Sequence, residues 1–176
     1  MAASGNPISE ASTTSTLWLP GSALHCYESS LRLRDWLLTP GLLTERIRSA
    51  AGDRFSMRVL CENAHGEEHL REIVMCCELR IWLFAQTRIP SNTLLLHPWL
   101  GHIGNNTLGA ALAKHSDTTR SDFSYSRLLP DTQIIADALR HSALPSQALW
   151  VRRSEFSVAR APFSLYEVFI PTIGEC

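Results

Sequence analysis

The chain has 176 residues, of which 45% are hydrophobic and 19% are charged, as in an ordinary globular protein with one domain. Its 16 basic and 17 acidic side chains give a formal net charge of -1, and this balance argues against nucleic-acid binding, which depends on an excess of basic side chains. Because no run of about 18 apolar residues is present, we expect no membrane insertion.

Residues 1–16 are rich in Ala, Ser and Thr and lack the basic and apolar regions of a secretory signal. We therefore predict a disordered tail over residues 1–16 and a single domain over residues 17–176, and we expect a monomer. The five cysteines are odd in number and contain no CxxC pair. This pattern predicts reduced thiols and a cytoplasmic protein.

Capping residues and the period of the apolar positions predict ten elements along the chain. In order, these are helices over 31–38 and 42–50, strands over 55–62, 70–77 and 81–89, a helix over 107–115, a strand over 119–128, a helix over 131–141, and strands over 148–156 and 163–170. The connections between strands are too short for serial βαβ crossovers. The predicted fold class is therefore α+β, with a six-stranded, mainly antiparallel sheet and helices packed on one face.

Two charged residues fall on faces of strands that are otherwise apolar. Alternation places Arg71 with Ile73, Met75 and Cys77, and it places Glu167 with Phe163, Leu165 and Phe169. Because an unpaired buried charge is costly, each side chain should be paired, neutralised or engaged with a ligand. Alternation does not decide between a structural Arg71–Glu167 salt bridge and a site that binds a carboxylate and handles a proton.

Other candidate features are weaker. Arg152 and Arg153 fall on opposite faces of one strand, so only one of them can point inward. The two glycines in the 104–109 segment would let backbone amides approach an anion at a helix start, although such a start is more often plain capping. The His65–His69 segment has the spacing of a zinc helix but contains Gly66 and lacks the HExxH order, which disfavours a metal. No phosphate-binding glycine motif or nucleophile elbow is present.

Seven short motifs, in order and spread from about residue 18 to residue 171, resemble the chorismate lyase family, also called chorismate-pyruvate lyases. They are Trp36–Leu38, Leu42–Thr44, Leu70–Ile73, Ala85–Pro90, Thr107–Gly109, Trp150–Ser154 and Glu167–Pro171. None is specific by itself, and their joint order and spacing carry the resemblance. The family often has Met at the position of Leu43 and Arg at the position of Gln86.

The resemblance implies a six-stranded antiparallel sheet with an enclosed product site beneath helical flaps. It also implies conversion of chorismate to 4-hydroxybenzoate and pyruvate, the first step of bacterial ubiquinone synthesis, with no cofactor. The implied ligand contacts come from Arg71, Glu167, the backbone of Leu108, and Leu43. A second interpretation is that the chain is a non-catalytic sensing module, because the implied fold is similar to the ligand-sensing domain of a family of bacterial transcription regulators. The first 30 residues contain no helix-turn-helix pattern, which argues against that second interpretation.

Overall fold

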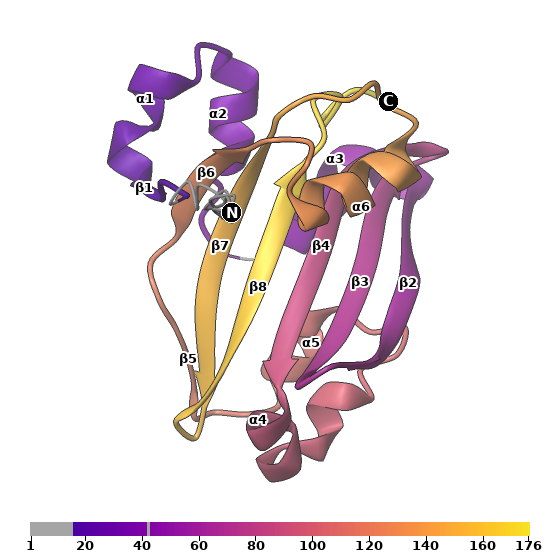
Figure 1. Ribbon diagram of the computed structural model, residues 1–176. Coiled ribbons are helices and arrows are strands. Elements are labelled where there is room, and N and C mark those ends of the chain that lie inside the picture. The colour runs from indigo at the N-terminus through magenta and orange to yellow at the C-terminus, as the bar shows by residue number, and fades with distance from the viewer. Residues whose placement is uncertain (1–15, 42) are drawn as a thin grey trace, which may run out of the picture.

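The structure is a computed structural model that describes residues 16–41 and 43–176 (Figure 1). Apart from Thr16, the predicted N-terminal tail lies outside the described residues, and so does Leu42, the first residue of a predicted helix. None of the described helices is both long and apolar enough to cross a membrane.

The described residues form one eight-stranded sheet in the order β1-β6-β7-β8-β4-β3-β2, with β5 also paired to β7. The strands are β1 (Leu19–Pro20), β2 (Phe55–His65), β3 (Glu68–Cys77), β4 (Arg80–Pro90), β5 (Thr118–Arg120), β6 (Ser124–Leu128), β7 (Leu149–Val158) and β8 (Ala161–Phe169). Every pairing is antiparallel, which confirms the predicted α+β class and strand direction.

The sheet has two strands more than the six that the sequence pattern predicts. One is the short β1, and the other arises because the predicted strand over 119–128 is divided into β5 and β6. Arg120 pairs with Phe156 and Ser124 pairs with Arg153, so this segment has one residue more between the two pairs than β7 has. The extra residue breaks the ladder locally, as a bulge does.

The helices are α1 (Leu24–Tyr27), α2 (Leu31–Leu37), α3 (Leu43–Ala51), α4 (Ser91–Leu96), α5 (Leu108–Leu112) and α6 (Gln133–Ser142). Four of them correspond to predicted helices, whereas α1 and α4 were not predicted. The side chain of Ser30 accepts a hydrogen bond from the Leu33 amide, as expected for the cap of α2. Helix α6 begins at Gln133, two residues after the start of the predicted helix over 131–141, and its N-cap is Thr132.

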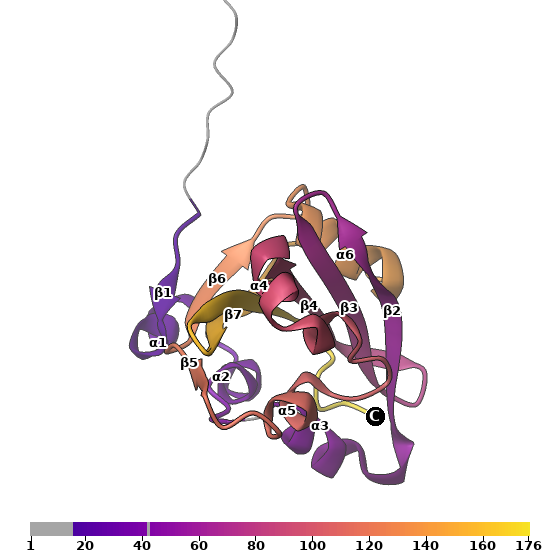
Figure 2. The same cartoon turned by 90° about the horizontal axis from the view of Figure 1, so that it is seen from below.

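Helices cover both faces of the sheet. On β3, Ile73 and Met75 belong to the apolar cluster that contains α3, whereas Val74, between them, belongs to the cluster that contains α6. Since successive side chains of a strand point to opposite faces, α3 and α6 lie on opposite sides. Figure 2 shows the sheet curving around α3 and α5, with α6 outside the curve. The predicted placement on one face therefore describes α3 and α5 but not α6, whose apolar stripe packs on the other side.

A disulfide joins Cys77, at the end of β3, to Cys176, with 5.7 Å between the two Cα atoms. The prediction of five reduced thiols is therefore wrong for this pair, while Cys26, Cys61 and Cys76 are free. The chain turns back after β8 and brings its last residues to the sheet, where the Trp82 indole donates a hydrogen bond to the Glu175 carbonyl. Because the two cysteines are 99 residues apart, sequence spacing gave no sign of this contact.

We expect the unfolded, unreduced protein to contain three reactive thiols, and five after reduction. Replacing Cys176→Ser removes the crosslink and should lower the free energy of unfolding by about 2–4 kcal/mol, because the unfolded chain gains freedom. Thiol titration and urea unfolding measure these two effects. The matched control is Cys26→Ser at an exposed, unbonded cysteine, which should unfold like the wild type. Five thiols without reduction would contradict the assignment.

Candidate active site

An apolar pocket lies between the concave face of the sheet and the helices that cover it, with about 590 Å³ of atom-free space when the solvent at its opening is included. Two adjacent rows of cross-strand neighbours on β3, β4, β8 and β7 form its floor. The first row is Arg71, Thr87, Leu165 and Ser154, and the second is Ile73, Ala85, Glu167 and Arg152. Their shared face follows from the period of two, so strand register places these polar groups among apolar neighbours.

The pocket is covered by α3, α5 and the segment that follows β5. Leu43 and Thr44 line it from the start of α3, and Leu108, Gly109 and Leu112 line it from α5. The structure thus brings together all four residues to which the resemblance assigned ligand contacts: Leu43, Arg71, Leu108 and Glu167. Arg120, Phe123, Thr87 and Ser154 also line the pocket and were not proposed from the sequence.

Arg71 is 1% exposed and fixes the loop that precedes α5. Its Nη2 donates to the carbonyl oxygens of Gly104 and Asn106, each at 2.8 Å, and its Nε lies 3.4 Å from Oε1 of Glu62. Glu62 in turn accepts a hydrogen bond from the Gly104 amide at 3.0 Å. Burial lowers the pKa of the Arg71 guanidinium and Glu62 raises it, but an arginine remains charged in either case.

Glu167 pairs with Arg152 on the neighbouring strand rather than with Arg71. Nε of Arg152 donates to Oε2 of Glu167 at 2.6 Å, and Nη1 of Arg152 donates to the Thr39 carbonyl at 2.8 Å. Arg71 and Glu167 lie two strands and one row apart, so about 10 Å across the sheet and about 7 Å along it separate their Cα atoms. Each has its own partner of opposite charge, and the pocket lies between them. The structure therefore does not contain the Arg71–Glu167 salt bridge that alternation had left open.

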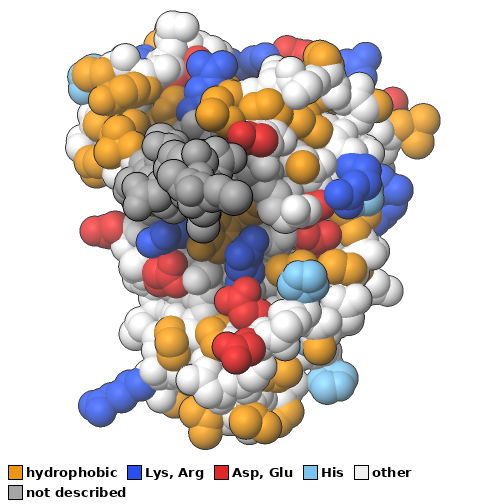
Figure 3. All heavy atoms as spheres, in the orientation of Figure 1, with side chains coloured by type: hydrophobic (Ala, Val, Ile, Leu, Met, Phe, Trp, Pro, Cys, Tyr) orange, Lys and Arg blue, Asp and Glu red, His pale blue; other side chains and the backbone are white. Residues whose placement is uncertain are grey.

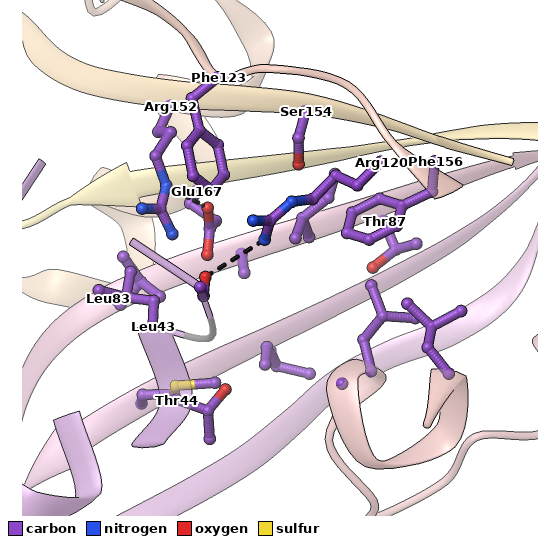
Figure 4. A pocket seen from close by; sticks show the side chains of 18 of the residues that line it. Leu43, Thr44, Leu83, Thr87, Arg120, Phe123, Arg152, Ser154, Phe156 and Glu167 are labelled. Atoms are coloured by element: carbon purple, nitrogen blue, oxygen red, sulfur yellow. Dashed lines mark hydrogen bonds and ion pairs between the residues drawn. The ribbon is translucent and has the colours of Figure 1, made fainter. Parts of the chain in front are cut away.

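Figure 4 shows Arg120, the third pocket arginine that contacts a backbone carbonyl of a covering segment. Nη1 of Arg120 donates to the Gly41 carbonyl at 3.2 Å. The Phe123 ring lies between Arg120 and Arg152, with ring-centroid distances of 4.4 Å and 4.1 Å to the two guanidinium carbons. Contacts of this kind hold cations against an aromatic face.

Tyr125, opposite Arg152 on β6, is buried beside this cluster. Burial raises the pKa of its phenol, and Arg152 lowers it.

Gln86 points away from the pocket. It is buried between two pocket residues of β4, so its side chain lies on the other face, where it donates to Glu72 and accepts from Arg88. Gln86, where the family often has Arg, therefore lies outside the pocket lining. Arg153 also lies on that face, whereas Arg152 points inward.

A family model described as chorismate lyase matches residues 64–174. The chorismate pyruvate-lyase of Salmonella arizonae is 31% identical over 155 residues, which cover 79% of this chain and 82% of that protein. The probable chorismate pyruvate-lyase of Thiobacillus denitrificans is 27% identical over 172 residues and 89% of each chain. The chain belongs to the chorismate lyase family.

Among solved structures, the C-terminal domain of a histidine utilization repressor from Pseudomonas syringae is similar in fold to this chorismate lyase family member. The TM-score is 0.53 at 12% sequence identity, and the match covers 68% of this chain and 94% of that domain. The likeness concerns the fold alone.

Replacing Arg152→Met should lower the free energy of unfolding by about 3–5 kcal/mol, because Glu167 would remain buried without its counter-ion. Replacing both partners, as in Arg152→Met with Glu167→Leu, should recover much of this loss. Urea unfolding of the two variants measures the difference. Arg153→Met, on the opposite face of the same strand, removes a partly exposed ion pair with Glu155 and a contact with the Trp18 ring, and it should cost about 1–2 kcal/mol, less than Arg152→Met. Equal losses in the single and double variants would show that the Arg152–Glu167 pairing does not set the cost.

Proposed function

We propose that this protein is a chorismate lyase that converts chorismate to 4-hydroxybenzoate and pyruvate in the first step of bacterial ubiquinone synthesis. We also propose that it acts in the cytoplasm, on the ground of this role and not of the thiol pattern, since Cys77 and Cys176 form a disulfide. The observation that carries the proposal is the placement of Arg71 and Glu167 around one apolar pocket in a member of the chorismate lyase family. The pocket is lined by apolar side chains that suit a flat ring.

In the proposed complex, Arg71 binds the ring carboxylate. Among the described residues, its Nη1 has no hydrogen-bond acceptor, so this nitrogen is available on the pocket side. A guanidinium to carboxylate contact is charge-assisted and directional. The first amide of α5, that of Leu108, has no acceptor within its own helix and can donate to the same ligand. Leu43 covers the ring with an apolar side chain.

Glu167 lies at the end of the ring that carries the C4 hydroxyl. Its Oε2 is occupied by Arg152, and its Oε1 has no donor among the described residues. In the reaction, the C4–H bond breaks and its electron pair becomes the C3–C4 double bond of the ring. The C3–O bond breaks with its electrons on the enolpyruvate oxygen, and protonation of the enolpyruvate methylene gives pyruvate. Glu167 assists this proton transfer or the departure of the enolpyruvate.

The ring becomes aromatic as the ether leaves, which supplies the driving force without an external oxidant or reductant. The protein then has to hold the substrate, exclude water and manage one proton. These tasks match the composition of the pocket, in which fixed charges stand among apolar side chains. We therefore propose that the reaction needs no cofactor. We also propose that the protein acts as a monomer.

Incubation of the purified protein with chorismate should yield equal amounts of 4-hydroxybenzoate, followed by chromatography, and pyruvate, followed by a coupled dehydrogenase assay. Glu167→Gln should lower kcat by about 10²–10⁴-fold, because the amide cannot accept the proton. The matched control is Glu155→Gln on β7, outside the pocket lining, which should keep the wild-type rate. Full activity of Glu167→Gln would remove Glu167 from the chemistry.

Arg71→Lys should raise KM for chorismate by about 10-fold or more, because lysine keeps the charge but cannot hold the Gly104 and Asn106 carbonyls and a ligand carboxylate at the same time. The measurement is the dependence of the initial rate on chorismate concentration. Unchanged kcat/KM would contradict the anchoring role. A folded protein that binds 4-hydroxybenzoate but forms neither product would instead favour the non-catalytic sensing module, whose fold is similar.

A further inference from the structure

The three arginines that line the pocket differ in how their charges are balanced. Arg71 lies beside Glu62, and Arg152 lies beside Glu167. Within residues 16–41 and 43–176, no carboxylate forms an ion pair with Arg120. Arg120 is therefore the one pocket cation whose charge the described protein leaves unbalanced.

Arg120 is placed where an entering ligand can reach it. It is the last residue of β5, and its side chain is exposed at the edge of the pocket while Arg71 and Arg152 are 1% exposed. Its guanidinium rests on Phe123 and donates one hydrogen bond, to the Gly41 carbonyl. Figure 4 shows its side chain directed into the cavity. A guanidinium has five N–H donors, so one bond to Gly41 leaves donors for a carboxylate.

We infer that Arg120 binds the second carboxylate of the substrate, the one on the enolpyruvyl ether, and so distinguishes substrate from product. This inference rests on the proposed function, because chorismate carries two carboxylates and 4-hydroxybenzoate carries one. The ether is attached at C3, next to the carbon that bears the hydroxyl, and Glu167 is the residue proposed for that end of the ring. Arg120 and Glu167 line the same pocket, and the Phe123 ring contacts both Arg120 and Arg152, the partner of Glu167.

The assignment gives each carboxylate its own guanidinium. Arg71 holds the group that substrate and product share, whereas Arg120 holds the group that leaves as pyruvate. When the C3–O bond breaks, the ring loses its link to the carboxylate at Arg120. Arg120 therefore contributes to the binding of chorismate and not to the retention of 4-hydroxybenzoate, and it acts as a specificity-determining residue.

Calorimetric titration of Arg120→Gln with two stable ligands tests this assignment without any turnover. The first ligand is 4-hydroxybenzoate, and the second is 3-(1-carboxyethoxy)-4-hydroxybenzoate, an aromatic mimic that keeps a second carboxylate on the ether. We expect Kd for the dicarboxylate to rise about 10- to 100-fold, the range for hydrogen bonds to charged groups, and Kd for 4-hydroxybenzoate to change less than about threefold. With chorismate, kcat/KM should fall in parallel with the affinity for the dicarboxylate.

Arg120→Gln removes the charge of Arg120 and shortens the side chain, so it also loses the contact with the Gly41 carbonyl, and that second loss should affect both ligands alike. If Arg120 only held the cover, Arg120→Gln would weaken both ligands equally or neither, and either result overturns the inference. Arg127→Gln, at an exposed arginine of β6 outside the pocket lining, is the charge-matched control and should change neither Kd. Absence of product formation by the wild type would refute the lyase function alone, since the two binding constants report on Arg120 independently.

Discussion

Arginine guanidinium groups hold the site together. Their side chains extend from the strands and donate hydrogen bonds to backbone carbonyls of the covering segments. Arg71 binds the carbonyls of Gly104 and Asn106 ahead of α5, Arg152 binds that of Thr39 behind α2, and Arg120 binds that of Gly41 ahead of α3. The covering helices are short, and short helices draw their stability from tertiary contacts rather than from their own hydrogen bonds. The walls of the pocket therefore depend on the same side chains whose charges face it.

Among the three pocket arginines, the two that have a carboxylate partner are buried, and the one without such a partner among the described residues is exposed. Arg71 and Arg152 are almost fully buried, and each has a carboxylate beside it, whereas the unmatched Arg120 stays exposed, where water solvates its charge. A buried ion pair contributes little net stability, because the loss of hydration offsets most of the attraction. It does fix charges in space before a ligand arrives, and charges that need no reorganisation are the ones that stabilise a reacting molecule most effectively.

Local alternation was sufficient to place Arg71 and Glu167 on the inward faces of their strands, and capping was sufficient to locate α2. The partners of these charges could not be predicted, because Glu62 and Arg152 come from neighbouring strands whose register depends on a bulge in β2 and on the hairpin between β7 and β8. Arg120 could not be predicted as a pocket residue for a related reason. One extra residue divides its strand into two, whereas the alternation over 119–128 predicted one continuous strand. The inward faces of Thr87 and Ser154, in contrast, were readable from the same alternation.

The use of Arg rather than Lys at position 71 follows from geometry. Its Nε and Nη2 already face Glu62 and two loop carbonyls, which lie outside the pocket lining on the side of α5. A ligand carboxylate must be bound by another part of the same group, and the planar fork presents donors along separate edges. A lysine would present one small charge to both sets of acceptors, so that loop and ligand would compete for it. The fork thus allows one side chain to hold the cover in place and still bind a carboxylate inside it.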